Sequence, residues 1–240
     1  FDIIINCAAY TDVDEAENNF NLAKSVNADA IEYFCEYLEQ THPKTVFIHI
    51  STDYIFDGES GKPYVETDES NPINVYGKTK LAGEKTLQTI MSTNALIIRT
   101  SWVHSEYGNN FVKTMLRLGK ERGEINVVSD QIGSPTYATD LAKVILKIID
   151  NKGYQDKDKA TDIYHYSNKG EISWYDFTKE IFKLAKIDCK VSPITTEHYP
   201  TPAKRPKNTL MSKDKIAEIF SVNILDWKKS LETYILSLKV

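Results

Sequence analysis

Three short runs of mostly apolar residues place the strongest constraint on the fold of this chain. They lie at residues 1–6, 45–50 and 95–100, and none alternates regularly between apolar and polar residues. This pattern is typical of strands buried on both faces of a parallel sheet. Between the first two runs, residues 21–40 carry apolar side chains at helical spacing, which predicts an amphipathic helix over one sheet face. The chain is therefore expected to adopt an α/β fold.

The composition excludes several classes of protein. The 240 residues are 41% hydrophobic, enough for a substantial core, and carry a net charge of −5 without a dense basic run, which argues against a nucleic-acid partner. The apolar runs are too short to cross a membrane, and the first residues lack the basic start of a signal peptide. Three widely spaced cysteines predict neither a disulfide framework nor a zinc site, so a reducing cytoplasm is the expected compartment.

Tyr76 and Lys80 are four residues apart in a segment expected to be helical. On a helix, this spacing places both side chains on one face. A nearby ammonium group favours the phenolate and lowers the pKa of a tyrosine from its usual value of about 10, so that the pair can exchange protons near neutral pH. Because Tyr-x-x-x-Lys also occurs by chance on protein surfaces, the spacing alone does not assign a function.

Thr52 directly follows the apolar run at residues 45–50. Functional groups in open α/β sheets gather at the carboxyl ends of the strands. We therefore expect the Thr52 hydroxyl to join Tyr76 beside a substrate carbonyl.

Thr52, Tyr76 and Lys80 belong to a series of short motifs that extends along nearly the whole chain. They are Asn6-Cys7-Ala8-Ala9-Tyr10-Thr11, Ser51-Thr52-Asp53-Tyr54, Asn71-Pro72-x-x-x-Tyr76-Gly77-x-x-Lys80, Arg99-Thr100-Ser101-Trp102, Gly108-Asn109-Asn110-Phe111, Asp130-Gln131-x-Gly133-x-Pro135-Thr136 and Tyr199-Pro200-Thr201-Pro202-Ala203-x-Arg205-Pro206. This series resembles the extended short-chain dehydrogenase/reductases and, among them, the dTDP-4-dehydrorhamnose reductases.

The resemblance implies a Rossmann-like doubly wound parallel sheet with a smaller substrate-binding α/β region. It also implies that NADPH or NADH reduces the 4-keto group of a nucleotide-sugar, dTDP-4-dehydro-6-deoxy-L-mannose, to give dTDP-L-rhamnose. Tyr76 would give the proton, Lys80 would lower the pKa of Tyr76 and hold the nicotinamide ribose, and Thr52 would hydrogen-bond the carbonyl oxygen. The choice between NADPH and NADH, a Mg²⁺ ion carried over from relatives, and a homodimer stay open.

Other site residues follow from the same resemblance. Ala8, Ala9 and Tyr10 would contact the cofactor, together with Tyr76 and Lys80. Asp53 and Trp102 would contact the substrate, together with Thr52. Independently of the resemblance, Arg205 is expected to bind the pyrophosphate of the substrate, because a guanidinium group suits phosphate oxygens. From the residues alone, the two alanines fit a tight turn, Trp102 fits a core position equally well, and Arg205 fits a surface charge. The acidic residues between positions 12 and 17 complement a helix dipole, so we expect no metal site there.

The glycine-rich phosphate-binding motif of dinucleotide-binding folds does not occur, and the first glycine is Gly58. The resemblance implies that residues 1–6 correspond to the fourth strand of the family's sheet. We therefore expect a fragment of a longer protein, in which residues 1–6 form an exposed apolar edge and the isolated chain binds the cofactor poorly. Residues 1–100 would be the remainder of the NAD(P)-binding domain with the catalytic residues. Residues 101–240 would be mostly the substrate-binding region, interleaved with late Rossmann elements.

Three other functions are weighed against this interpretation. Nucleotide-sugar 4,6-dehydratases place Asp-Glu after the threonine, whereas this chain has Asp53-Tyr54, which argues against dehydration. A 4-epimerase is excluded less firmly. A non-catalytic role is the third, since the regulatory subunit of methionine adenosyltransferase also resembles this family.

The remaining pattern predicts further elements. We expect strands at residues 125–128 and 163–167, helices at 111–120, 140–149, 174–186, 213–220 and 224–238, a loop at 150–160 and an extended segment at 194–205.

Overall fold

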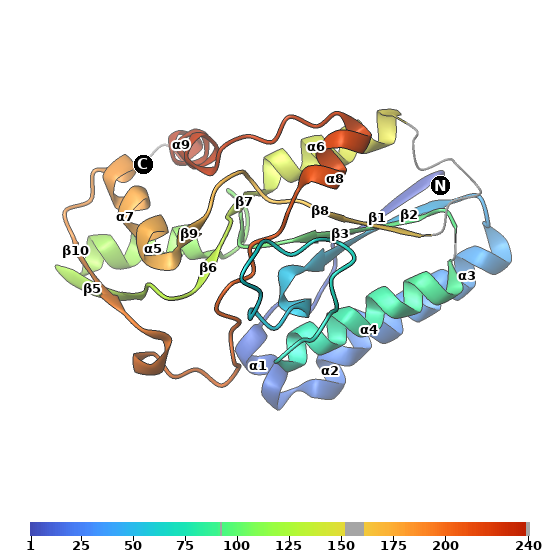
Figure 1. Cartoon of the computed structure of the whole chain (residues 1–240), viewed down its shortest axis with the longest axis horizontal. Helices are drawn as coiled ribbons and strands as arrows, with labels where there is room; N and C mark the ends of the chain where they lie inside the picture. Colours follow the sequence, from blue (N-terminus) through green and yellow to red (C-terminus); the bar gives the residue numbers. More distant parts are fainter. Residues whose placement is uncertain (92, 152–160, 239–240) are drawn as a thin grey trace.

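The structure is a computed structural model that describes residues 1–91, 93–151 and 161–238. At its centre, a four-stranded parallel sheet has the order β1-β2-β3-β8 (Figure 1). The strands are β1 (Ile3–Asn6), β2 (Val46–Thr52), β3 (Ala95–Thr100) and β8 (Asp162–His165). The predicted α/β class with a parallel sheet is confirmed. β1 lies at the edge of this sheet with Ile5 exposed, as expected for residues 1–6.

Helices cover both faces of the sheet. Successive side chains of a strand point to opposite faces, so each strand contributes apolar side chains to both. Phe47 of β2 packs on one face with α3 (Ala30–Thr41) and α4 (Val75–Ile90). Ile48 packs on the other face with α6 (Ala138–Asn151) and α8 (Asp214–Phe220). In Figure 1, α3 and α4 lie below the sheet and α6 and α8 above it.

A second region has its own core of apolar and aromatic side chains. Its helices are α5 (Phe111–Glu121), α7 (Trp174–Ala185) and α9 (Trp227–Ser237), and β5 (Glu124–Val128) pairs in parallel with β10 (Lys190–Ile194). Short strands connect this region to the sheet: β4 (Val103–His104) pairs with β7 (Thr136–Tyr137), and β6 (Ile132–Gly133) with β9 (Ile172–Ser173).

The single helix expected at residues 21–40 is interrupted. The structure has α1 (Val13–Asn18), α2 (Phe20–Lys24), a π-helical turn η1 (Ser25–Asp29) and then α3. Asn27, in the π-helical turn, bonds to both backbone groups of Tyr10 and to Thr79 of α4. A Cβ on Gly83 of α4 would lie 2.2 Å from Asn27 O, so the glycine permits this close packing. Helical periodicity does not reveal such a tertiary contact.

Other element boundaries differ from the expected ones by a few residues. β8 ends at His165 rather than at residue 167, and α9 begins at Trp227 after the N-cap Asp226. The segment expected to be extended contains the 3-10 turn η4 (Thr196–His198), and a second 3-10 turn, η2 (Asp53–Ile55), follows β2. The expected loop at 150–160 lies outside the described residues beyond position 151.

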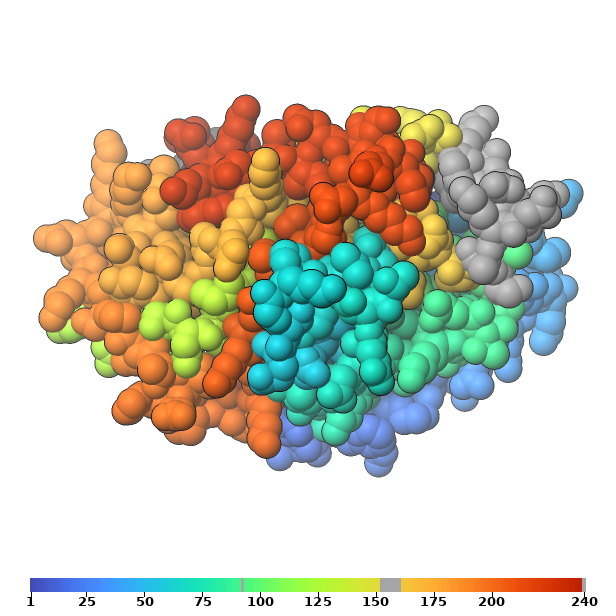
Figure 2. Space-filling view, viewed as in Figure 1, coloured from blue at the N-terminus to red at the C-terminus, as the bar shows by residue number. Residues whose placement is uncertain are grey.

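The connection between η2 and α4 is anchored on the C-terminal part of the chain. Tyr64 N donates to Leu210 O and Ser212 N donates to Tyr64 O, each at 2.8 Å. Figure 2 shows this connection, in teal, on the front face against the orange-red C-terminal segment. These two backbone hydrogen bonds therefore attach the connection before α4 to residues 210–212.

Candidate functional site

The ends of β1, β2 and β3 lie side by side at the carboxyl edge of the sheet, because the strands are parallel and in register. Residues 7–9 follow β1, residue 52 ends β2 and residue 53 begins η2, and residues 101–102 follow β3. The N-terminus of α4 packs beside η2 at this edge. The candidate residues at these strand ends and at the start of α4 therefore lie along one edge of the sheet.

Tyr76 lies in the first turn of α4. Asn74 caps this helix, and its side-chain oxygen accepts a hydrogen bond from Gly77 N at 2.8 Å. The half-buried ring of Tyr76 meets the ring of Tyr54 edge-on, at 5.9 Å between centroids. A Cβ on Gly77 would lie 2.1 Å from Tyr54 O, so only glycine allows this approach.

The pKa of Tyr76 differs from the expected one. Burial raises the pKa of Tyr76 to about 12, a hydrogen bond with Thr52 lowers it, and the charge of Asp53 raises it. The sequence-based expectation that Lys80 lowers this pKa is therefore wrong for this structure. The physical reason is that the Lys80 ammonium is turned toward β2. At neutral pH, Tyr76 is a protonated phenol.

Lys80 is 1% exposed and lies against β2. Its Nζ donates a hydrogen bond to Ile50 O at 2.7 Å and lies 3.3 Å from Nε2 of His49. Burial lowers the pKa of Lys80 to about 8, and the charge of Glu84 opposes this effect. A pKa of about 8 means that Lys80 changes its charge at mildly alkaline pH.

Thr52 ends β2 and Asp53 begins η2, and both residues are buried. Thr52 Oγ1 donates to Asp53 Oδ1 at 3.2 Å and accepts from Tyr54 N at 3.2 Å. The other carboxylate oxygen of Asp53 accepts a hydrogen bond from Thr209. Burial raises the pKa of Asp53 to about 7, whereas the hydrogen bonds from Thr209 and Thr52 lower it.

The turn after β1 contains small residues and is held by hydrogen bonds to side chains. Cys7 and Ala8 are exposed, and Ala8 N donates to Asn6 Oδ1 at 3.1 Å. Tyr10 N donates to Asn27 Oδ1 at 2.8 Å, so the turn is held at both ends. In the described part of the chain, the buried Ser51 Oγ has no hydrogen-bond partner. The turn therefore presents small exposed side chains, and the neighbouring strand β2 carries this unpaired hydroxyl.

Trp102 follows β3 with a positive φ of 48°, which is unusual for a large side chain. Its ring stacks on Trp174 of α7, with 3.5 Å between centroids and 11° between planes. Both tryptophans are half-buried, so one edge of the stacked pair is accessible. The sequence analysis predicted the helix that begins at Trp174 but did not name this tryptophan as a candidate site residue.

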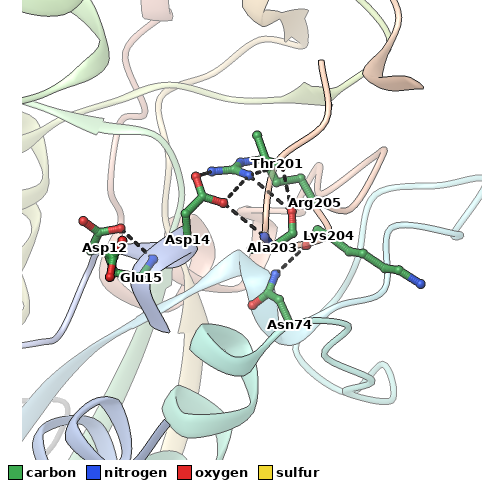
Figure 3. Close-up of polar contacts among 8 residues, drawn as sticks. All are labelled: Asp12, Asp14, Glu15, Asn74, Thr201, Ala203, Lys204 and Arg205. Carbon is green, nitrogen blue, oxygen red and sulfur yellow. Dashed lines mark hydrogen bonds and ion pairs between the residues drawn. The ribbon is translucent and has the colours of Figure 1, made fainter. Parts of the chain in front are cut away.

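Arg205 binds a carboxylate (Figure 3). Its Nη1 donates to Asp14 Oδ1 at 3.0 Å and its Nη2 donates to Asp14 Oδ2 at 2.7 Å. Nη1 also donates to Thr201 Oγ1 at 2.6 Å. One residue earlier, Lys204 O accepts a hydrogen bond from Asn74, which caps α4. The segment at 201–205 is therefore attached to both α1 and the helix that carries Tyr76.

The described residues contain no group of three or more His, Cys, Asp or Glu side chains that could hold a metal ion. In the same part of the chain, no helix combines the length and the apolar character of a membrane span.

Comparisons with known proteins agree with this geometry. The profile of the RmlD substrate binding domain matches residues 1–240. The dTDP-4-dehydrorhamnose reductase of Aggregatibacter actinomycetemcomitans is 44% identical over 236 residues, which cover 96% of this chain and 79% of the relative. The crystal structure of a dTDP-4-dehydrorhamnose reductase from Clostridium acetobutylicum has a TM-score of 0.92 at 43% identity, covering 100% of this chain and 81% of that one. The enzyme of that name from Bacillus anthracis, solved in complex with NADP, has a TM-score of 0.90 at 39% identity, covering 98% and 80%.

Proposed function

We propose, because this chain belongs to the dTDP-4-dehydrorhamnose reductase family, that it reduces the 4-keto group of dTDP-4-dehydro-6-deoxy-L-mannose to give dTDP-L-rhamnose. The observation that carries the proposal is the meeting of Tyr76, Lys80 and Thr52 at the carboxyl edge of the parallel sheet. That edge is where open α/β sheets bind their ligands. The reaction belongs to dTDP-rhamnose biosynthesis.

Tyr76 is the proton donor in this proposal. A phenol that stays protonated at neutral pH donates a hydrogen bond to a carbonyl oxygen and gives up its proton as that oxygen becomes an alkoxide. The Thr52 hydroxyl is within hydrogen-bonding reach of Tyr76, and it would turn its one proton from Asp53 to the same oxygen when the substrate binds. When bound, the reduced nicotinamide supplies the hydride.

Ala8, Ala9 and Tyr10 would hold the nicotinamide end of the cofactor, and Lys80 would hold its ribose. We favour NADPH over NADH because the Bacillus anthracis relative was solved with NADP. Mg²⁺ is an expectation of the resemblance alone, and EDTA in the activity assay tests it. The three cysteines are free, which supports the cytoplasm as the compartment.

We propose that the Trp102–Trp174 stack, Asp53 and Arg205 form the substrate side of the site. Residues 101–240 would then be mostly substrate-binding, and residues 1–100 would hold the cofactor and the catalytic side chains. Arg205 pairs with Asp14, so its guanidinium can bind a pyrophosphate only if it leaves the Asp14 carboxylate or binds both groups at once. Asp14→Asn should therefore lower the KM for the nucleotide-sugar and Arg205→Lys should raise it. If both variants raise the KM by similar amounts, the ion pair is structural.

The deciding experiment mixes the full-length protein with the 4-keto nucleotide-sugar and either NADPH or NADH, and follows the loss of absorbance of the reduced nicotinamide. We expect stoichiometric oxidation of the cofactor and formation of dTDP-L-rhamnose. An epimerase would convert the sugar without net use of cofactor, and a regulatory subunit would do neither. A dehydratase of this superfamily would need a second carboxylate directly after Asp53. This chain has Tyr54 there instead, and the Tyr54 ring packs against Tyr76.

A further inference from the structure

His49 lies inside β2, fully buried, between Asn6 and Lys80. Its Nδ1 is 3.1 Å from Nδ2 of Asn6, and its Nε2 is 3.3 Å from Nζ of Lys80. The imidazole therefore connects the end of β1, where the candidate cofactor turn begins, to the lysine of α4. The reaction proposed above gives this histidine no role.

The orientation of the Asn6 amide determines which nitrogen of His49 carries the proton. Ala8 N donates a hydrogen bond to Asn6 Oδ1 at 3.1 Å, so the amide oxygen faces Ala8 and the NH₂ group faces His49. Nδ1 of His49 must then accept. A neutral imidazole has one N–H, which this arrangement places on Nε2. Burial, followed by the charge of Lys80, lowers the pKa of His49 well below its usual range, so the ring is neutral.

The Nε2–H of His49 therefore points at Lys80. An ammonium group has three donors and no lone pair, so a facing N–H donor opposes the charged form. A neutral amine has a lone pair that accepts this N–H, while one of its own hydrogens still binds Ile50 O. We propose that Asn6 and His49 are positioning residues that stabilise the uncharged amine of Lys80 and so set the pH at which Lys80 changes charge. The link to catalysis rests on the proposed reductase function.

Other ionisable groups also act on Lys80. Glu84 lies one helical turn beyond it and, together with Cys7, favours the ammonium form. Both carboxylate oxygens of Glu84 are bound by Arg99, which weakens the field of Glu84 at Lys80. Tyr76 stays protonated at neutral pH and adds no charge. The hydrogen-bonded chain from Asn6 through His49 thus opposes Glu84 and Cys7, which favour the ammonium form of Lys80.

The first test reads the tautomer of His49 in the unmodified protein. Two-dimensional nitrogen–proton NMR of the imidazole rings distinguishes the Nε2–H form, the Nδ1–H form and imidazolium. The signals are assigned by their loss in His49→Gln, with His198→Gln at an exposed site as the matched control. We expect the Nε2–H form at neutral pH. The Nδ1–H form or imidazolium would overturn the proposal, and this result needs no variant to be active.

The second test is a double-mutant cycle on the titration of Lys80, followed through its Cε chemical shift and assigned with Lys80→Arg. In Asn6→Asp, the new carboxylate accepts from Nδ1–H, so Nε2 becomes an acceptor and stabilises the ammonium form. We expect the proton affinity of Lys80 to rise about tenfold or more, one pH unit in its midpoint. In the His49→Phe background, Asn6→Asp should have a much smaller effect. Equal shifts in both backgrounds would show that His49 transmits nothing.

Kinetics separate this inference from the proposed function. If Lys80 acts in the reaction, the basic limb of the kcat profile of Asn6→Asp moves with the NMR midpoint. If the midpoint moves and the rate profile does not, the role of Lys80 in the reductase proposal fails while the His49 tautomer stands. If the protein is inactive in every assay, the NMR cycle still decides whether Asn6 and His49 control Lys80.

Discussion

Removal of the Glu84 charge should destabilise the fold far more than removal of an exposed carboxylate from a similar ion pair. The side chains of Glu84 and Arg99 are 1% and 4% exposed. Arg99 Nη2 donates to Glu84 Oε2 at 2.7 Å, and Arg99 Nε donates to both carboxylate oxygens at 3.1 Å. In Glu84→Gln, the guanidinium stays buried without an anion, which costs about 3–5 kcal/mol. Whole domains are stable by only about 5–15 kcal/mol, so the loss is large.

The matched control is the pair Arg117–Glu121, whose side chains are 60% and 52% exposed. Glu121→Gln should cost less than about 1 kcal/mol, because water screens this pair. Urea unfolding followed by tryptophan fluorescence measures both changes. The double variant Glu84→Leu/Arg99→Met should recover much of the loss, because no unpaired charge remains buried. If Glu84→Gln and Glu121→Gln cost the same within about 1 kcal/mol, the argument from burial is wrong.

Three further predictions concern the site itself. Tyr76→Phe should lower kcat by about 10²–10⁴ and leave cofactor affinity nearly unchanged, because the ring stays and only the proton donor is lost; steady-state rates and a fluorescence titration test this, and near-normal turnover contradicts it. Burial raises the pKa of Asp53 to about 7, so the folded protein holds this proton more tightly than the unfolded chain. Wild type should therefore lose stability relative to Asp53→Asn as the pH rises from about 4 to about 7, by up to about 4 kcal/mol; urea unfolding at several pH values measures the gap, and a constant gap contradicts it. NADPH should slow alkylation of the exposed Cys7 but not of Cys189, as followed by mass spectrometry; equal slowing at both thiols argues against the cofactor position.

The parallel sheet could be predicted from the sequence because its strands are buried on both faces. β2 and β3 lie within two residues of the apolar runs that predicted them. The place of Thr52 was predicted from a rule about strand ends, whereas Tyr76 was singled out by its four-residue spacing from Lys80. Sequence patterns of this kind succeed where one physical requirement acts along a continuous segment.

The features that the sequence did not reveal are contacts between distant segments. Arg205 pairs with Asp14 across 191 positions. The surroundings of Lys80 depend on His49 of β2, which helical spacing within α4 cannot indicate. The pKa of Tyr76 was predicted in the wrong direction, because a four-residue spacing shows which face a lysine occupies but not where its amine points.

Asn74 has a consequence for how the protein assembles during synthesis. Its side-chain oxygen secures the first turn of α4, while its Nδ2 donates to Lys204 O, 130 residues later in the chain. On the ribosome, helix α4 emerges long before that carbonyl does. Asn74 therefore cannot donate this second hydrogen bond until residue 204 has left the exit tunnel, so nascent chains released earlier would contain Tyr76 on a helix whose cap residue is only partly bonded.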